Sequence, residues 1–443
     1  MTRSCLFGVL LLLLLGCHSA KKTTTEVPAF SDTVTSITTP PAIPPAATGR
    51  TDSLLDQFFV QNPQLFDSII LNKLAWNVQV IYTQIDRNEK NEPALRDYFW
   101  NVDRNRYFYP ASTVKMPVAL MALQKLKELG VRGLDRKTTM VTGADYSGQT
   151  PVYNDPNTPD GKPNIEQYIK RIFLVSDNDA FNRLYEFVGP AAINENLRKM
   201  GYGEAQIRHR VDIALSEDEN RHTNPIQFFD AMGKLVYSQA AGVDNEVFER
   251  RNESLGKAFY KWGKLVNEPM DFSTKNRIAL EDLHNILKSI YFPGAMQPAQ
   301  RFNIYPDDYK LVYKAMSQYP TESRFPTYDT TEFYSAYCKF FMMGADPKAV
   351  PRPGLRIFNK VGDAYGFLLD VAYVVDFENK IEFMLSIVMY CNEDNILNDD
   401  HYDYERIGYP FFKNISEKIY QYELHRPRKY APDLNSLRFD YQR

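Results

Sequence analysis

Two long apolar runs near the end of the chain constrain the fold most strongly. Phe367–Phe377 and Ile381–Tyr390 are rich in β-branched and aromatic residues, and only the polar tripeptide Glu378-Asn379-Lys380 separates them. This pattern predicts a β-hairpin. Two more strand-like runs, Asn77–Asp86 and Tyr98–Val102, lie near the start of the folded part. Because strand-like runs occur at both ends, we expect one sheet built from N-terminal and C-terminal strands.

Segments with helical periodicity fill the middle of the chain. The sequence therefore predicts an α+β fold, in which helices flank an antiparallel sheet and an all-helical lobe is inserted between its strands. Aromatic residues and prolines interrupt the helical pattern of residues 237–330, where we expect an insert. The expected helices are residues 64–74, 112–130, 165–174, 180–188, 279–291 and 405–425.

The size and charge of the chain limit its partners. It has 443 residues, of which 44% are hydrophobic and 24% are charged, enough for one large domain that we place at residues 51–443. The net charge is −3, with lysine and arginine scattered among the acidic residues. Without a basic face, nucleic acid is not expected as a partner. We expect a monomer.

The N-terminus has the features of a lipoprotein signal. Arg3 precedes the apolar run Leu6–Leu15, which is too short to span a membrane and suits a signal peptide. The following Gly16-Cys17 completes a pattern typical of a bacterial lipobox, which predicts cleavage of residues 1–17 and lipidation of Cys17; a signal peptide with a chance cysteine is the alternative. Residues 18–50 are rich in Thr, Pro, Ala and Ser and predict a disordered tether. We therefore expect a lipid-anchored protein of the cell envelope, periplasmic or associated with the outer membrane.

Metal and cofactor signatures do not occur in the sequence. The six histidines are scattered, none belongs to an H-E-x-x-H motif, and there is no C-x-x-C motif. We expect neither a metal nor a cofactor. Cys338 and Cys391 could pair in an oxidising compartment or remain free and buried.

The segment Ser112-Thr113-Val114-Lys115 opens the helix expected over residues 112–130. Residues three apart share one face of a helix, so the hydroxyl and the amine would point the same way. A serine at a helix N-terminus beside a desolvated lysine is a potential nucleophile, but serine is also a common helix cap. About one or two S-x-x-K matches are expected by chance in a chain of this length, and Ser19–Lys22 and Ser254–Lys257 match as well. The spacing alone does not distinguish nucleophile from cap.

Two later motifs narrow the choice. Ser176-Asp177-Asn178 interrupts a helical region, where it could place a hydroxyl and an amide in a cleft or simply cap helices. Lys360-Val361-Gly362 directly precedes the predicted hairpin, so we expect Lys360 at the start of an edge strand, with Gly362 allowing a ligand to approach the backbone.

The order S-x-x-K, S-D-N, K-x-G resembles that of the class A β-lactamases and penicillin-binding proteins, over nearly the whole folded part. The resemblance implies that Ser112 is acylated, that Lys115 is its base, and that Ser176 bridges the serine, the second lysine and the leaving nitrogen. It also implies that Asn178 holds Lys115 and a substrate amide. Lys360 and Gly362 would bind substrate, with Lys360 attracting a carboxylate. The backbone N–H groups of Ser112 and Asp363 would form the oxyanion hole.

Two positions depart from the family pattern. Val361 replaces the usual hydroxyl residue of the third motif, which should weaken carboxylate recognition by about 1.5–3 kcal/mol. The family also has a Glu on an Ω-type loop that activates water, with an Arg two residues before it and an Asn four residues after it. Anchoring on Arg210 puts Asp212 at the Glu position and Ser216 at the Asn position. Asp212 could be the base that releases the acyl group, although it is one methylene shorter, or a structural loop carboxylate.

Two functions remain compatible with these motifs. The first is a serine hydrolase of amide bonds, acting on β-lactams or on peptides resembling those of peptidoglycan, with slow deacylation. The second is a catalytically impaired lipoprotein whose cleft binds a cell-wall ligand or a protein partner.

Overall fold

The computed structural model describes residues 49–249 and 251–441. The expected signal peptide, with Cys17, and nearly all of the expected tether lie outside the described residues. Of the tether only Gly49 and Arg50 are described, and Arg50 forms an isolated antiparallel bridge with Val102.

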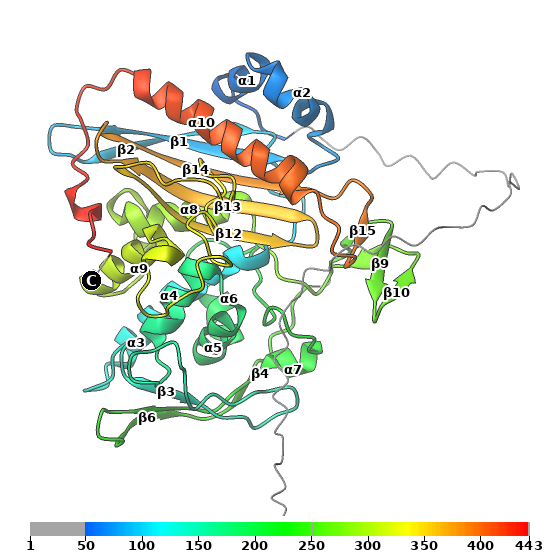
Figure 1. Ribbon diagram of the computed structural model, residues 1–443. Coiled ribbons are helices and arrows are strands. Elements are labelled where there is room, and N and C mark those ends of the chain that lie inside the picture. The colour runs from blue at the N-terminus through cyan, green and yellow to red at the C-terminus, as the bar shows by residue number, and fades with distance from the viewer. Residues whose placement is uncertain (1–48, 250, 442–443) are drawn as a thin grey trace, which may run out of the picture. The chain divides into compact units, whose positions relative to one another are not determined.

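The domain is built on a five-stranded antiparallel sheet with the order β12-β13-β14-β1-β2 (Figure 1). Strand β1 from the start of the domain pairs with β14 from its end. The expected sheet built from both ends of the chain is therefore confirmed, as is the hairpin, formed by β13 and β14. The strands are β1 Gln79–Arg87, β2 Pro93–Trp100, β12 Leu355–Ala364, β13 Phe367–Asp376 and β14 Ile381–Tyr390.

The edge strand β12 starts earlier than the sequence predicted. Lys360 does not stand at its start, because residues 355–359 precede it in the strand. Two polar residues in this stretch obscure the apolar pattern: Arg356 pairs with Glu322, and Asn359 belongs to a buried polar network. Strand β12 turns into β13 through the two residues Tyr365 and Gly366, with φ of 52° and 78°, as in a type I′ turn.

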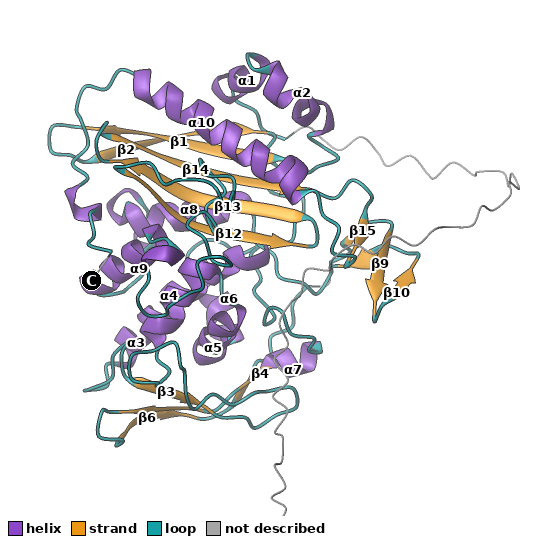
Figure 2. Cartoon of the chain, viewed as in Figure 1, coloured by secondary structure: helices purple, strands orange, loops and turns teal. Residues whose placement is uncertain are grey.

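Helices cover both faces of the sheet (Figure 2). Alternate side chains of a strand point to opposite faces: Val80 and Tyr82 enter the core beneath α1, α2 and α10, whereas Ile81 and Ile85 enter the core shared with α3–α6, α8 and α9. Strands β13 and β14 are buried along their whole length. The longer helices are α1 Ser53–Val60, α2 Pro63–Asn72, α3 Lys115–Leu129, α4 Ile165–Val175, α5 Asn178–Val188, α6 Pro190–Lys199, α8 Leu280–Tyr291, α9 Pro306–Ser317 and α10 Tyr409–His425.

The α+β class is confirmed, but the lobe between β2 and β12 is not all-helical as predicted, because short strands occur there as well as helices. Strands β3, β5 and β6 form a small antiparallel sheet, and β9, β10 and β15 form another. Helix α8 lies in the region expected as an insert. It packs against β1, β13 and β14 and so belongs to the helices that cover the main sheet. The short elements are β3 Thr139–Thr142, α7 Glu217–Arg221, β4 His222–Thr223, β5 Ile226–Phe229, β6 Leu235–Gln239, β7 Gly242–Val243, β8 Ser254–Leu255, β9 Ala258–Lys261, β10 Lys264–Val266, β11 Met270–Asp271 and β15 Ile396–Leu397.

A buried polar network ties residues 338–341 to the edge strand. The Lys339 amine donates to Asn359 Oδ1 at 2.6 Å and to the carbonyl oxygens of Met316 and Ile357 at 2.7 and 3.0 Å. The Asn359 amide donates to the carbonyl oxygen of Cys338 and to Asp370 Oδ1. Because buried polar groups are costly when unpaired, this network fixes the segment in one position.

We predict that Lys339→Met lowers the free energy of unfolding by about 3 kcal/mol, because it leaves one amide oxygen and two carbonyl oxygens unpaired in the core. Urea unfolding followed by circular dichroism measures the change. Lys310→Met is the matched control: both partners of the Lys310–Asp307 pair are exposed, so a change within about 0.5 kcal/mol is expected. Equal effects in the two variants would contradict the assigned role.

Candidate active site

Ser112 lies in a 3₁₀ turn, η1 (Ala111–Val114), that leads directly into α3. Ala111 has φ of 47°, a left-handed conformation that costs a non-glycine residue roughly 1 kcal/mol. Backbone strain therefore sits immediately before the serine. The turn fixes the direction of the Ser112 Cα–Cβ bond and leaves the first N–H groups of the helical segment without intrahelical acceptors.

Gly362 allows the edge strand to lie against this turn. A Cβ atom at Gly362 would be 3.0 Å from Ser112 N, 3.1 Å from the Pro110 carbonyl oxygen and 3.1 Å from Thr113 N. All three are backbone atoms, so a larger residue would push the strand away from the serine. The sequence predicted that Gly362 would let a ligand come close to the backbone. The group that comes close to Gly362 in the structure is the turn that carries Ser112.

The contact aligns two backbone donors. In an antiparallel ladder, hydrogen-bonded and non-hydrogen-bonded pairs alternate. Ala364 and Phe367 flank the two-residue turn as a hydrogen-bonded pair, so the next pair, Asp363–Leu368, is of the other kind. The Asp363 N–H therefore points away from β13, toward the side where η1 lies. Together with the Ser112 N–H it can receive a developing oxyanion.

Lys115 is completely buried at the start of α3. Its amine donates to the Ser176 carbonyl oxygen and to Asn178 Oδ1, both at 2.5 Å. Burial lowers the pKa of Lys115 well below its usual range, and the charge of Lys360 lowers it further. A neutral amine has two N–H groups and one lone pair. Two oxygen acceptors use both N–H groups, which leaves the lone pair free to accept a proton.

Lys360 reaches the same serine from the sheet. Its amine donates to Ser176 Oγ at 2.8 Å and to the Val361 carbonyl oxygen at 2.7 Å, and burial lowers the pKa of Lys360 to about 8. Ser176 Oγ is also 3.4 Å from the Lys115 amine. Ser176 therefore stands between the two lysines. Among the described residues the Ser112 hydroxyl has no hydrogen-bond partner, so it is free to rotate toward either Lys115 or Ser176.

The sequence left two roles open for the Ser-Asp-Asn tripeptide, capping helices and placing polar groups in a cleft, and the tripeptide has both. Ser176, with φ of 59°, ends α4, and Asp177 caps α5 by accepting from the Ala180 N–H at 2.8 Å. Asp177 also pairs with Arg171. This capping turns the Ser176 hydroxyl and the Asn178 amide toward the buried lysines.

One face of α5 positions the loop that carries Asp212. Asn178 Nδ2 donates to Asp212 Oδ2 at 3.0 Å. Four residues on, the Asn182 amide forms two hydrogen bonds with the backbone of Val211, at 2.9 and 3.0 Å. Another four residues on, Glu186 accepts from Arg210 Nε at 2.7 Å. Residues at i, i+4 and i+8 of the helix thus hold three consecutive loop residues. Sequence reasoning missed Asn182 and Glu186, although their spacing from Asn178 was a usable signal.

The loop differs from the sequence expectation at Ser216. Ser216 caps α7: its hydroxyl bonds the Glu219 carboxylate at 2.8 Å and accepts from the Glu219 N–H. It is therefore committed to the helix. Asp212 is exposed, has φ of 57°, and keeps only the Asn178 hydrogen bond among the described residues.

A cavity of about 750 Å³ brings most of the predicted site residues together. Ser112, Ser176, Asn178, Asp212 and Asp363 line it, while Lys115, Lys360 and Gly362 lie behind its wall. Sequence reasoning missed a further part of the lining, which comes from residues 333–340 and 398–409. These segments have no regular period that would have marked them. Their lining residues are Phe333, Tyr334, Tyr337, Cys338, Phe340, Asn398, Asp400, Tyr402 and Tyr409.

The two cysteines do not form a disulfide. Cys338 and Cys391 are both free and buried, which decides the alternative that the sequence left open. Burial raises the pKa of Cys338 to about 11, so this thiol is not a nucleophile near neutral pH. No group of side chains in the described residues could hold a metal ion.

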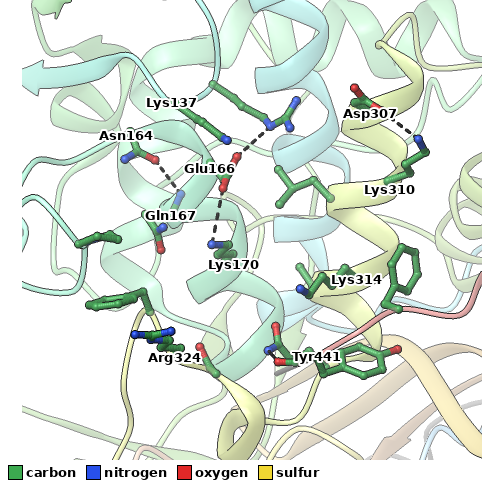
Figure 3. A pocket seen from close by; sticks show the side chains of 18 of the residues that line it. Lys137, Asn164, Glu166, Gln167, Lys170, Asp307, Lys310, Lys314, Arg324 and Tyr441 are labelled. Carbon is green, nitrogen blue, oxygen red and sulfur yellow. Dashed lines mark hydrogen bonds and ion pairs between the residues drawn. The ribbon is translucent and has the colours of Figure 1, made fainter. Parts of the chain in front are cut away.

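A second cavity, of about 780 Å³, lies between α4 and α9 and contains none of these motifs (Figure 3). Several charges in its wall are paired with one another. Glu166 binds Arg136 at 2.9 Å and Lys170 at 3.6 Å, and Lys310 binds Asp307 at 3.1 Å. This second cavity is therefore a charged groove, whereas the two buried amines and the aligned N–H groups lie around Ser112. Of the described helices, none is long and apolar enough to cross a membrane.

We predict that Asn182→Ala lowers the free energy of unfolding by about 1–3 kcal/mol, because it leaves the buried N–H and carbonyl groups of Val211 unpaired. Hydrogen exchange at the Val211 and Asp212 amides should become faster than in the unmodified protein. Asn72→Ala is the control, since the Asn72 side chain is half-buried and makes one exposed hydrogen bond, to the carbonyl oxygen of Ser68 within its own helix. Unchanged exchange at both amides would show that α5 does not hold the loop.

Comparisons with known proteins agree on one family. A family model described as the beta-lactamase enzyme family matches residues 69–422. No curated protein matched the sequence. Among solved structures, a β-lactamase from Xanthomonas campestris is 12% identical, with coverage of 83% of this chain and 96% of that chain and a TM-score of 0.44.

Two further structures are similar at the same level. The β-lactamase from Streptomyces albus G is 12% identical, with coverage of 80% and 98% and a TM-score of 0.41. A mutant of PBP-A, solved as an acyl-enzyme complex with penicillin G, is 14% identical, with coverage of 84% and 97% and a TM-score of 0.44. At these identities and TM-scores no residue role is transferred from the solved structures.

Proposed function

Because the chain belongs to the beta-lactamase enzyme family, we propose that it is a serine hydrolase that forms an acyl-enzyme on Ser112. Its substrates would be amides such as β-lactams or peptides resembling those of peptidoglycan. One observation carries the proposal: Lys115 is buried one helical turn after Ser112, both N–H groups of its neutral amine have acceptors, and its pKa lies well below the usual range. Such an amine is a general base.

In acylation the Ser112 hydroxyl gives its proton to the Lys115 lone pair as Oγ bonds the carbonyl carbon. The N–H groups of Ser112 and Asp363 stabilise the oxyanion. Both belong to backbone held by the Gly362 contact, so they need not reorganise as charge develops.

The leaving nitrogen then takes a proton as its bond to carbon breaks. Ser176 is the donor, because Lys360 already donates to Ser176 Oγ and thereby directs the Ser176 proton elsewhere. The proton held by Lys115 can replace it across the 3.4 Å between the two groups. The protons balance: one leaves Ser112 and one reaches the leaving group.

Release of the acyl group needs an activated water. The Asp212 carboxylate accepts a hydrogen bond from Asn178, and Asn178 accepts one from Lys115. Asp212 is therefore linked to Lys115 through a single residue. Its side chain is exposed, and Ser216 is committed to capping α7. A water at Asp212 would therefore be held by few partners, and we propose that deacylation is slow compared with acylation.

The proposed place of action is the cell envelope. The sequence Leu14-Leu15-Gly16-Cys17 supports lipidation of Cys17 after cleavage of a signal peptide. A lipid anchor at the N-terminus would keep the domain close to cell-wall substrates.

We predict that a fluorescent penicillin, incubated with the purified protein until labelling saturates, attaches covalently, and that Ser112→Ala abolishes the attachment. Intact-protein mass spectrometry gives the adduct, and gel fluorescence gives the rate. Lys115→Met should slow labelling by about 10²–10⁴-fold, the range of general base catalysis.

Ser254→Ala is the matched control, since Ser254 belongs to the other S-x-x-K sequence of the folded domain but begins the short strand β8. It should label like the unmodified protein. If the unmodified protein binds the probe without forming an adduct, the cleft is a binding site and acyl-enzyme formation with β-lactams is ruled out.

We predict that a chromogenic cephalosporin gives a burst of about one equivalent followed by slow turnover, because deacylation limits the cycle. Asp212→Asn should slow the second phase by roughly tenfold and leave the burst unchanged. Stopped-flow absorbance separates the phases. Glu217→Gln, at the start of α7 directly after this loop and exposed, should change neither phase. Rapid turnover without a burst would contradict slow deacylation, and an unchanged second phase in Asp212→Asn would remove Asp212 as the base.

A further inference from the structure

The charge of the catalytic cavity is one-sided. Four carboxylates line it, those of Asp177, Asp212, Asp363 and Asp400. Of the described residues in its wall, none is a lysine, an arginine or a histidine. An anion-binding cleft would be expected to present cationic side chains or clustered donors to its ligand.

Two of these carboxylates lack a hydrogen-bonded partner. Asp177 pairs with Arg171, and Asp212 accepts from the Asn178 amide. The carboxylates of Asp363 and Asp400 make no hydrogen bond or ion pair with any residue that the structure describes. Burial raises the pKa of Asp363, and the nearby charges of Lys360 and Lys115 lower it. Asp363 also directly follows Gly362, the residue in contact with the nucleophile turn.

The strand beside the serine presents no donor side chain to an anion. Strand β12 contributes an isopropyl group, a carboxylate and a methyl group to the cavity, from Val361, Asp363 and Ala364. Lys360 is buried behind the wall, and its amine is committed to Ser176 Oγ and to a carbonyl oxygen. Even with Lys360 charged, the carboxylates outnumber it. A substrate carboxylate here would meet a like charge.

Aromatic rings complete a surface suited to cations. Tyr334, Tyr337, Tyr365, Tyr402 and Tyr409 line the cavity, and ring faces attract cations. Burial raises the pKa of Tyr337 and of Tyr409, and the Asp363 charge raises both further. The negative potential of Asp363 therefore reaches the rings that share its part of the cavity.

In the proposed reaction the leaving group would lie in the cavity that Ser176 and Asp363 line. Ser176 protonates the leaving atom in the proposed reaction, and Ser176 is hydrogen-bonded to Lys360 of β12. Ser176 and Asp363 line the same cavity, so a charged substituent on the leaving group would share that cavity with the Asp363 carboxylate.

Resting on the proposed function, we propose that the cavity selects acyl donors with a cationic leaving group over donors with a carboxylate there. Asp363 is the main specificity-determining residue, and Asp400 strengthens the preference. The substrate class is thus an amide or ester whose leaving portion carries a protonated or quaternary amine close to the scissile bond.

Three thioesters of one N-acylglycine test this selection. Their leaving thiols have the same reach and differ in charge: 2-(trimethylammonio)ethanethiol is cationic, 3,3-dimethylbutanethiol is its neutral isostere, and 3-mercaptopropionate is anionic. In each case Ser112 Oγ forms an ester with the acyl carbon as the C–S bond breaks, and the thiol leaves with the serine proton. Released thiol is measured colorimetrically on the full-length protein, with Ser112→Ala as the background.

The cationic thioester should acylate Ser112 at least about tenfold faster than the anionic one, measured as the second-order rate constant. Asp363→Asn, which keeps the shape of the side chain, should reduce this ratio by about tenfold, and Asp400→Asn should reduce it less. Glu332→Gln neutralises an exposed carboxylate next to the lining segment and outside the lining itself. It should change the ratio less than about twofold, because an exposed charge is screened.

The outcomes separate the two proposals. Ser112-dependent release with equal rates for the three thioesters, or faster release from the anionic one, overturns the selection and leaves the serine hydrolase intact. An unchanged ratio in both Asp363→Asn and Asp400→Asn removes these carboxylates as its cause. No Ser112-dependent release from any thioester overturns the proposed function and the selection together.

Discussion

The burial of two lysine amines on either side of Ser176 is the constraint on which the rest of the site depends. Lys115 comes from the start of α3 and Lys360 from an edge strand near the other end of the chain, and both bond the same residue. The pairing of β1 with β14 puts β2, which precedes Lys115 in the chain, and β12, which carries Lys360, in one sheet. The desolvation that is costly for an ammonium is the same effect that lowers the pKa of Lys115 and suits it to the role of base in the proposed reaction.

Buried polar networks hold this arrangement from two directions. In the helical lobe, Asn178, Asn182 and Glu186 on one face of α5 hold the adjoining loop. On the sheet side, Lys339 and Asn359 attach the segment after residue 333 to the edge strand. Burial lowers the pKa of Lys339 to about 8, so this second lysine network has an environment like that of the site but lacks a nucleophile. A buried lysine alone therefore does not mark the candidate site, which differs from the Lys339 network by the strained turn at Ser112 and the free N–H groups beside it.

Sequence reasoning recovered what local chemistry dictates and missed what only packing decides. The sheet from both chain ends, the β13–β14 hairpin and the meeting of Ser112, Ser176, Asn178 and Asp212 at one cavity follow from motif order and hydrophobic pattern. The start of β12 was missed because Arg356 and Asn359 interrupt its apolar pattern with partners far away in the sequence. The aromatic wall was missed because residues 333–340 form no regular element. Gly362 was correctly singled out for close backbone approach, but only the structure shows that the neighbour is the nucleophile turn.

The two halves of the proposed reaction are supported unequally by the fold. Every group assigned to acylation is part of an element that a close contact or a buried network fixes, such as Gly362 on η1 or Lys115 between two oxygen acceptors. The carboxylate assigned to deacylation stands on an exposed loop with one hydrogen bond, while Ser216 is committed to the end of α7. Changes in a surface loop are tolerated far better than changes in a core. Release of the acyl group can therefore vary with little effect on its formation, and the lifetime of the acyl-enzyme is the property of this site most open to adjustment.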